Sequence, residues 1–268
     1  MSSHTDLHQL NRSIAKLGHM SVVQKIDDLI AEDESHRAGT FPSHVLKRLE
    51  ELMPAKMKST AETGCGKSTI LFSNISSHHT VFCINDKKET DSSINFFKNC
   101  PLTDLKKIEM VLGPTQDTLP RYRKFRTYDA VLIDGPHGYP FPEIEYYYFY
   151  PHLKKGSLLI LDDVHIATIG RLADFINEDP MFDFVELVST TAVFRRTEAP
   201  TFNAFGDGWW EQDYNRRRIP AHNKYQNKFR LSDGKMKQSF AELILSDLNA
   251  QQVERKEPKS LLNRLLRI

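Results

Sequence analysis

The sequence predicts an α/β protein built on a doubly wound, mostly parallel sheet of seven strands. Short apolar segments alternate with segments of helical periodicity from residue 58 onward, and this alternation is typical of parallel sheets whose strands are joined by helices. The last two apolar segments lie close together, which predicts a terminal hairpin with an antiparallel last strand. The predicted strands are residues 58–62, 80–84, 108–112, 130–133, 157–161, 184–188 and 192–195.

Helices are predicted before, between and after these strands. An apolar stripe over residues 20–30 predicts the first helix, and a second is expected from Ser43, as its N-cap, to Pro54. The later predicted helices are residues 68–75, 91–97, 142–153, 168–177 and 239–248. We expect three parts, which are an N-terminal arm and helix (1–42), a core (43–198) and a C-terminal extension or lid (199–268) that begins with an aromatic, basic segment.

The composition narrows the class of protein. The chain has 268 residues, 26% of them charged, and a net charge of +1, which indicates a globular protein and argues against binding to nucleic acid. Residues 201–268 carry 13 basic and 8 acidic side chains, and this excess suits an anionic partner. Three cysteines without a Cys-x-x-Cys pair indicate neither a disulfide framework nor a zinc ribbon. With no signal-like or membrane-spanning segment, we expect a cytoplasmic protein.

A glycine loop, AETGCGKST, follows the first predicted strand and opens a helix. A phosphate-binding loop needs the pattern G-x-x-x-x-G-K-[ST]; Gly66, Lys67 and Ser68 fit it, but Ala61 stands where its first glycine belongs. This pattern is also weakened by the polar strand before the loop, because buried parallel strands are usually apolar. A phosphate-handling enzyme therefore remains an alternative interpretation.

The same loop also fits the binding of a nucleoside with a charged amino-acid group. In that chemistry an acidic residue, here Glu62, stands two positions before a Gly-x-Gly turn formed by Gly64 and Gly66. Asp86 lies 20 residues beyond Gly66, after the next strand, where a carboxylate reaches a ribose hydroxyl in dinucleotide-binding units. A tight structural turn at the glycines and a solvated turn at Asp86 are the alternatives.

Further motifs follow the later strands in a fixed order. They are Gly113-Pro-Thr-Gln-Asp117, Asp129-Ala-Val-Leu-Ile-Asp134-Gly-Pro-His137, Gly156-Ser-Leu-Leu-Ile-Leu-Asp162-Asp163-Val-His165 and Thr191-Ala-Val-Phe-Arg-Arg196. With the glycine loop, they make residues 43–197 resemble the class I S-adenosylmethionine-dependent methyltransferases, which have a Rossmann-like fold. The similarity is to the small-molecule O-methyltransferases of the catechol and macrocin sugar types.

This resemblance implies a cofactor, a reaction and a set of cofactor-binding residues. The cofactor is S-adenosylmethionine, and the reaction is methyl transfer to a hydroxyl of a small molecule such as a sugar or another polyol. The residues expected to bind the cofactor are Glu62, Gly64, Cys65, Gly66, Ser68, Asn85, Asp86, Thr115, Gln116 and Asp134. A methyltransferase-like protein without catalytic activity, acting through its aromatic tail, is a second alternative.

Three carboxylates predict a metal site. Asp134, Asp162 and Asp163 follow apolar strands at the edge of the sheet where open α/β proteins bind ligands. Carboxylates that converge repel one another unless they hold a cation, and oxygen ligands suit Mg²⁺. Related sugar-modifying enzymes carry the same three aspartates. The alternative is that Asp162 or Asp163 caps the next helix.

Histidines and tryptophans complete the predicted site. His137 and Asp134 are the expected catalytic residues. His137, three residues after Asp134, is the expected general base, because the ordinary pKa of histidine is near neutrality; a surface turn is the alternative. His165, Trp209 and Trp210 are candidates for contact with the acceptor, and packing of an extension is the alternative for the tryptophans. The leucine-rich tail at 260–268 suits packing, a membrane surface or a partner subunit, and we therefore include a homodimer among the expectations.

Overall fold

The computed structural model describes residues 20–29, 41–84, 93–201, 208–209, 212–218 and 238–256. Contacts divide the chain into two compact units, residues 1–121 and 122–268. Residues 1–19 of the predicted N-terminal arm and the leucine-rich tail at 260–268 lie outside the described residues. None of the helices in the described ranges is long and apolar enough to cross a membrane.

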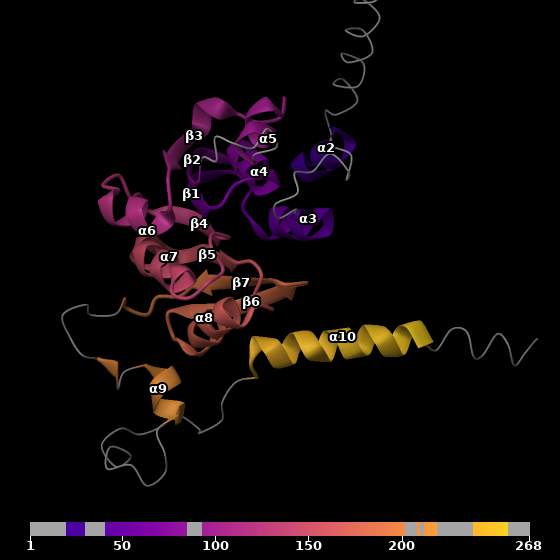
Figure 1. The fold of residues 1–268 in the computed structure, drawn as a ribbon, viewed down its shortest axis with the longest axis vertical. Helices are drawn as coiled ribbons and strands as arrows, with labels where there is room; N and C mark the ends of the chain where they lie inside the picture. Colours follow the sequence, from indigo (N-terminus) through magenta and orange to yellow (C-terminus); the bar gives the residue numbers. More distant parts are fainter. Residues whose placement is uncertain are drawn as a thin grey trace, which may run out of the picture. The chain divides into compact units, whose positions relative to one another are not determined.

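All seven predicted strands are present, in the order β3-β2-β1-β4-β5-β7-β6 (Figure 1). Strands β1, β2 and β3 pair in parallel, and so do β4 and β5. Strand β7 is antiparallel to both β5 and β6, as the predicted terminal hairpin requires. The predicted fold class is therefore confirmed.

The first unit contains β1, β2 and β3 with their helices. Its elements are α2 (Val22–Leu29), α3 (Ser43–Leu52), β1 (Met57–Thr63), α4 (Lys67–Ile75), β2 (Ser76–Cys83), α5 (Ser93–Asn99), β3 (Ile108–Leu112) and the short α6 (Thr115–Thr118). Strand β1 is buried although it is polar, and its Thr60 side chain is hydrogen-bonded to Ser76 and His79 of the neighbouring β2. The polar composition that argued against a buried strand therefore has a structural explanation.

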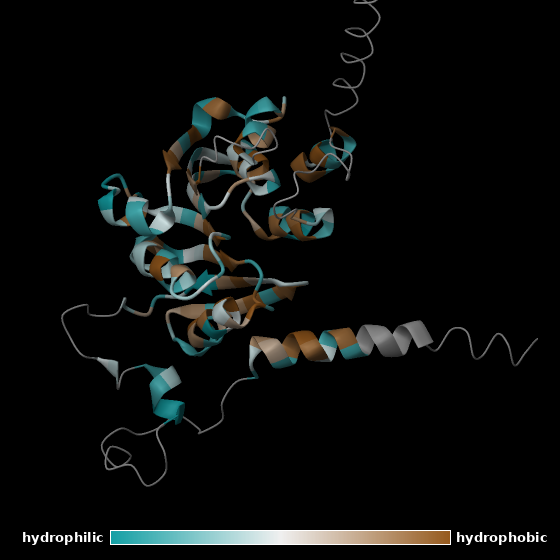
Figure 2. Cartoon of the chain, viewed as in Figure 1, coloured by the Kyte–Doolittle hydropathy of each residue, from teal (hydrophilic) through white to brown (hydrophobic). Residues whose placement is uncertain are grey.

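The second unit contains the other four strands. Its elements are β4 (Tyr128–Ile133), α7 (Phe141–Phe149), β5 (Leu153–Leu161), α8 (Ala167–Glu178), β6 (Phe182–Val188), β7 (Thr191–Arg196), α9 (Asp213–Arg218) and α10 (Phe240–Lys256). Strands β4 and β5 carry nearly continuous apolar runs that are fully buried, as expected of strands covered on both faces. Figure 2 shows this contrast with the hydrophilic α9.

Several predicted boundaries were wrong; for example, β2 begins at Ser76 and not at residue 80. Ser43 is not the N-cap of α3: Pro42 is, and the Ser43 hydroxyl donates to Asp27 of α2. The helix predicted at 142–153 ends at Phe149, because a 3-10 turn follows and Leu153 already belongs to β5. Helix α10 continues to Lys256, beyond the predicted end at 248.

Arginines of α9 hold the start of the C-terminal extension against α8. Arg218 donates to Glu178 Oε1 at 2.6 Å, and Arg217 donates to Glu178 Oε2 at 3.2 Å. Glu178 is buried, so these two guanidinium groups neutralise a carboxylate that would otherwise be costly to bury. The sequence had predicted no helix at α9, since six residues are too few to show a helical period.

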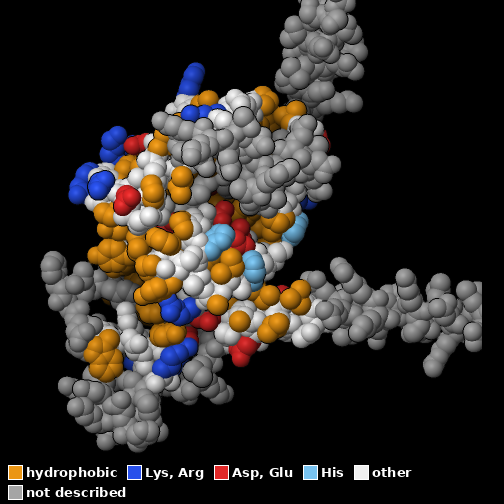
Figure 3. Space-filling model, in the orientation of Figure 1, with side chains coloured by type: hydrophobic (Ala, Val, Ile, Leu, Met, Phe, Trp, Pro, Cys, Tyr) orange, Lys and Arg blue, Asp and Glu red, His pale blue; other side chains and the backbone are white. Residues whose placement is uncertain are grey.

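The first residue of α10 is also anchored. Phe240 is fully buried and lies edge-on to Phe184 and Phe194, and its backbone N–H donates to Asp174 Oδ1 at 2.8 Å. Farther along, Leu245 and Leu248 are exposed, and Figure 3 shows hydrophobic side chains at the surface of this helix. The helix is therefore packed at its start, and most side chains between residues 241 and 249 are exposed.

Asp179, directly after α8, predicts a dependence of stability on pH. Burial raises its pKa to about 6, although the Met181 N–H and Arg196 act in the opposite direction. The folded chain therefore binds the proton of the Asp179 carboxyl group more tightly than the unfolded chain does. The stability that this protonation contributes is lost as the pH rises from about 4 to about 6. We expect Asp179→Asn to raise the free energy of unfolding by about 1 kcal/mol at neutral pH and to leave it unchanged at about pH 4.

Urea unfolding at several pH values measures this effect. The matched control is Asp183→Asn, which changes an exposed aspartate on β6 and should leave the pH profile of stability unchanged. If the free energy of unfolding changed with pH in the same way in wild type and in Asp179→Asn, the loss of stability with rising pH could not be assigned to Asp179.

Candidate functional site

The glycine loop joins β1 to α4 through a network of hydrogen bonds. Gly64 has a φ of +82°, a left-handed conformation that glycine adopts without strain, and its N–H donates to Phe82 O at 2.9 Å. The Gly66 N–H donates to Thr69 Oγ1 at 2.9 Å, and the Thr69 hydroxyl donates to Glu62 Oε1. Glu62 therefore orders the loop through Thr69.

Glu62 itself is fully buried in β1. Its Oε1 accepts a hydrogen bond from the Thr69 hydroxyl and lies 3.1 Å from His79 Nε2. Its Oε2 has no solvent access and no hydrogen-bond partner among the residues that the structure describes. A buried carboxylate oxygen without a donor is costly, so this oxygen is suited to a donor supplied by a ligand.

The residues expected near the adenine follow β3. Gly113, with a φ of +133°, turns the chain into α6, where Thr115 is buried and Gln116 is exposed. Thr115 Oγ1 has no hydrogen-bond partner among the described residues either. Thr115 thus offers a second unused polar atom, whereas Gln116 is free to reach a ligand from the surface.

The other cofactor-binding candidates are placed as follows. Cys65 is partly exposed between the two glycines, and Ser68 is buried in the first turn of α4. Asn85 and Asp86, the candidates for the ribose, lie outside the described residues.

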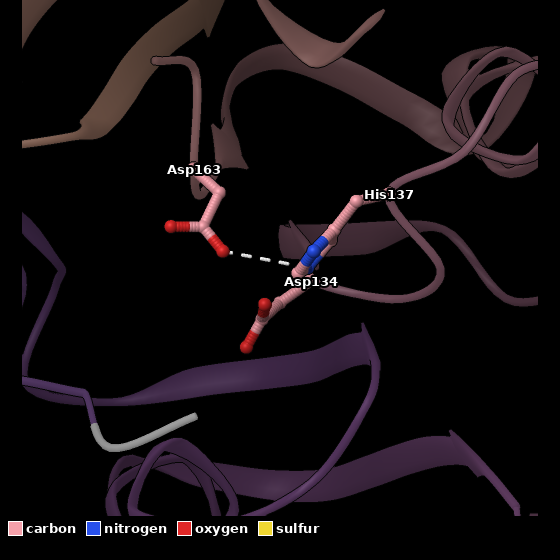
Figure 4. A group of neighbouring side chains, drawn as sticks. All are labelled: Asp134, His137 and Asp163. Atoms are coloured by element: carbon pink, nitrogen blue, oxygen red, sulfur yellow. Dashed lines mark ion pairs between the residues drawn. The ribbon is translucent and has the colours of Figure 1, made fainter. Parts of the chain in front are cut away.

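Two of the three predicted metal ligands lie together at the ends of β4 and β5. The register of these parallel strands pairs Ile133 with Leu161, so the residues that follow each strand are neighbours. Asp134 and Asp163 come together there with His137, and one ligand atom from each lies within 4.8 Å of the others (Figure 4). Asp163 reaches this position with a φ of +55°, uncommon for a residue with a side chain.

Asp162 makes different contacts. Its Oδ1 accepts a hydrogen bond of 2.6 Å from the Thr191 hydroxyl at the start of β7, and its N–H donates to Ile133 O. Burial raises the pKa of Asp162, while the bond from Thr191 acts in the opposite direction. Asp162 is therefore tied to the terminal hairpin, and the structure groups Asp134 and Asp163 with a histidine instead.

Both predicted histidines lie beside Asp163. His137 Nε2 is 3.4 Å from Asp163 Oδ2, and His165 Nδ1 is 3.6 Å from Asp163 Oδ1. The backbone of His137 is held as well, because its carbonyl accepts a hydrogen bond from Thr168 of α8. His137 remains exposed, so its ring can meet a ligand.

A comparison with protein families concerns the chain from β1 to just after β5. Residues 61–164 match the family model described as "Methyltransferase domain". This segment is a methyltransferase domain. It contains the glycine loop, Thr115 and the group at the ends of β4 and β5. A match to a methyltransferase disfavours the phosphate-binding alternative, and Ala61, in place of that loop's first glycine, is buried within β1.

Two solved structures have a fold similar to that of this chain. A putative caffeoyl-CoA O-methyltransferase from Staphylococcus aureus is 14% identical, with a TM-score of 0.51 over 72% of this chain and 99% of its own. Cofactor-bound Rv0187 from MTB is 15% identical, with a TM-score of 0.51 over 70% of this chain and 96% of its own. No curated protein sequence matches this chain. At such low identity the two structures show the fold.

The candidates beyond the methyltransferase domain have other contacts. Trp209 is partly exposed, and its carbonyl accepts a hydrogen bond of 3.1 Å from the Asn215 side chain of α9. Trp210 lies outside the described residues. Contact of either tryptophan with the acceptor stays a prediction.

Two residues near Glu62 were not predicted. Thr69 appeared only as the last residue of the glycine-loop segment, and His79, one of eleven histidines, belonged to no motif. The signal that could have found them is polarity within buried elements, since His79 is fully buried in β2 and Thr69 in α4. Buried polar side chains are nearly always hydrogen-bonded, so such residues indicate that bonding partners lie nearby.

Proposed function

We propose that this protein is an S-adenosylmethionine-dependent methyltransferase that methylates a hydroxyl oxygen of a small molecule. The observation that carries the proposal is Glu62, whose buried Oε2 has no hydrogen-bond donor among the described residues around the glycine loop. The ammonium group of the cofactor supplies N–H donors and a positive charge, and a charge-assisted hydrogen bond there satisfies the carboxylate. The oxygen acceptor is supported by the printed name of the Staphylococcus aureus neighbour.

Other residues of the first unit complete the proposed cofactor site. Gly64 and Gly66 let the nucleoside approach the backbone, and the Thr115 hydroxyl, which has no partner in the described part of the chain, is available to the adenine edge with Gln116. Asn85 and Asp86 are proposed for the ribose. Calorimetry with S-adenosylhomocysteine tests the site: we expect saturable binding by the full-length protein, and absence of binding would overturn the proposal.

We further propose that Asp134, Asp163 and His137 hold a divalent cation. The fit rests on the donor set, two carboxylates and an imidazole whose ligand atoms lie within 4.8 Å of one another. Two oxygens and one nitrogen accept Mg²⁺ and suit Mn²⁺ better than an all-oxygen set does. A cation bound there would lower the pKa of the acceptor hydroxyl.

The residues of the chain then have defined roles. Asp134 and Asp163 neutralise the cation and position the acceptor oxygen, while His165, on the other oxygen of Asp163, holds that carboxylate in place. In the alternative, the three aspartates hold the metal and His137 accepts the hydroxyl proton, as expected from the sequence. The anionic acceptor, the homodimer and the cytoplasmic location stay predictions.

Metal binding distinguishes these two ligand sets. We expect Asp163→Asn and His137→Gln each to weaken Mn²⁺ binding, measured by electron paramagnetic resonance, by about tenfold or more, because each removes one ligand. Asp162→Asn is the matched control, since the side-chain oxygen of the introduced asparagine can still accept the Thr191 hydroxyl. Loss of Mn²⁺ in Asp162→Asn with full retention in His137→Gln would instead support the three aspartates and leave His137 as the base.

A further inference from the structure

A buried chain of hydrogen bonds connects β1, β2 and α4 behind the glycine loop. The Ser76 hydroxyl donates to Phe72 O at 2.6 Å, and the Thr60 hydroxyl donates to Ser76 Oγ at 3.0 Å. Thr60 Oγ1 also lies 2.8 Å from His79 Nδ1. All of these side chains are buried, and the His79 ring stacks on Phe72 with centroids 5.0 Å apart.

The strand register explains why these residues meet. Thr60 of β1 pairs with His79 of β2 in a parallel ladder, so their side chains stand on the same face. Glu62 lies two residues after Thr60 and therefore on that face as well. Helix α4 covers the face, since Phe72 and Thr69 both reach these side chains.

The donor of each hydrogen bond in this buried network can be assigned. The Ser76 proton goes to Phe72 O and the Thr60 proton goes to Ser76, so Thr60 must accept from His79, whose Nδ1 therefore carries a proton. At the opposite end, the Thr69 hydroxyl accepts from the Gly66 N–H and donates to Glu62 Oε1. All the hydroxyl protons are then in use.

The contact between His79 Nε2 and Glu62 Oε1, at 3.1 Å, must contain one further proton. Without it, two lone pairs would face each other in a buried site. The pair therefore holds a single proton and no net charge, whether the proton resides on the ring or on the carboxyl group. A buried carboxylate is thus compensated before any ligand arrives.

We propose that His79 is a positioning residue that shares a proton with Glu62 Oε1 and so keeps Glu62 Oε2 available for the ammonium group of the cofactor. This inference rests on the proposed function. When the ammonium reaches Oε2, the shared proton stays on His79, and Glu62 meets two cations, one on each oxygen. No proton has to leave Glu62 for the solvent when the ligand binds.

His79→Phe tests the role, because phenylalanine can keep the stacking on Phe72 but lacks both ring nitrogens. A carboxyl group buried without a cationic partner is more stable protonated, so the variant must release that proton when S-adenosylhomocysteine binds. We expect its affinity to fall by about tenfold and its binding to release about one proton more than wild type. Calorimetry in buffers of different ionisation enthalpy measures both quantities.

A matched control and a second measurement complete the experiment. His78→Phe changes the neighbouring, partly exposed histidine, which pairs with Glu109, and should alter neither affinity nor proton release. The ¹⁵N spectrum of wild type bound to S-adenosylhomocysteine should show both nitrogens of His79 protonated, and this arm stands even where His79→Phe fails to fold.

The outcomes separate the two proposals. If wild type binds S-adenosylhomocysteine but His79→Phe binds it equally well with the same proton count, the inference about His79 is overturned and the proposed function stands. A His79 ring with only one protonated nitrogen in the complex overturns it as well. If wild type itself does not bind, the proposed function fails.

Discussion

Glu62→Gln should reduce the affinity for S-adenosylhomocysteine by at least about 100-fold. The Thr69 hydroxyl donates to the Oε1 position, so the side-chain oxygen of glutamine belongs there, and its amide nitrogen then takes the place of Oε2. A donor would face the ammonium group where an anionic acceptor faces it now. The variant loses the charge-assisted hydrogen bond and gains a clash of donors.

The stability of this variant separates binding from folding. Glutamine cannot share the proton that lies between His79 Nε2 and Glu62 Oε1, so the free protein should also lose stability, although Glu62 Oε2 has no partner among the described residues. Calorimetry measures the affinity and thermal unfolding measures the stability. The matched control is Glu109→Gln, which changes a partly exposed glutamate of β3 that pairs with His78 and should bind like wild type. Near-normal binding by Glu62→Gln would contradict the placement of the ammonium group.

The sequence was sufficient to predict the sheet and to identify the residues at the ends of its strands. Apolar strands such as β4 and β5 are covered on both faces, and their composition alone identifies them. Because the carboxyl ends of parallel strands lie at one edge, Asp134 and the Asp162-Asp163 pair could be assigned to a common region. The glycine loop was likewise recognisable from its place between a strand and a helix.

Which of two consecutive aspartates joins Asp134 could not be predicted. The choice depends on the left-handed backbone of Asp163 and on the Thr191 hydroxyl, 29 residues away from Asp162. Neither has a local sequence pattern. His79 was missed for a similar reason, since only the register that pairs it with Thr60 brings it to Glu62.

Gly135→Ala should lower the free energy of unfolding by about 3 kcal/mol. A Cβ at this position, directly after Asp134, would lie 2.1 Å from Glu145 Oε1. Glu145 belongs to α7 and is fully buried, so its carboxylate cannot turn into solvent to make room. Either the carboxylate leaves its present contacts or the loop after β4 shifts, and a shift would also displace Asp134 and His137.

A control at a second glycine and a double-mutant cycle test whether the clash with Glu145 causes this loss of stability. Gly138 lies in the same loop, and a Cβ there would meet only Phe141 Cδ2, at 3.9 Å, so Gly138→Ala should cost well under 1 kcal/mol. If the clash with Glu145 is the cause, Glu145→Ser should make room, and the double variant should be more stable than the sum of the single effects requires. If the two changes in the free energy of unfolding, measured with urea, were additive, glycine would be needed at position 135 for its backbone conformation and Glu145 would play no part.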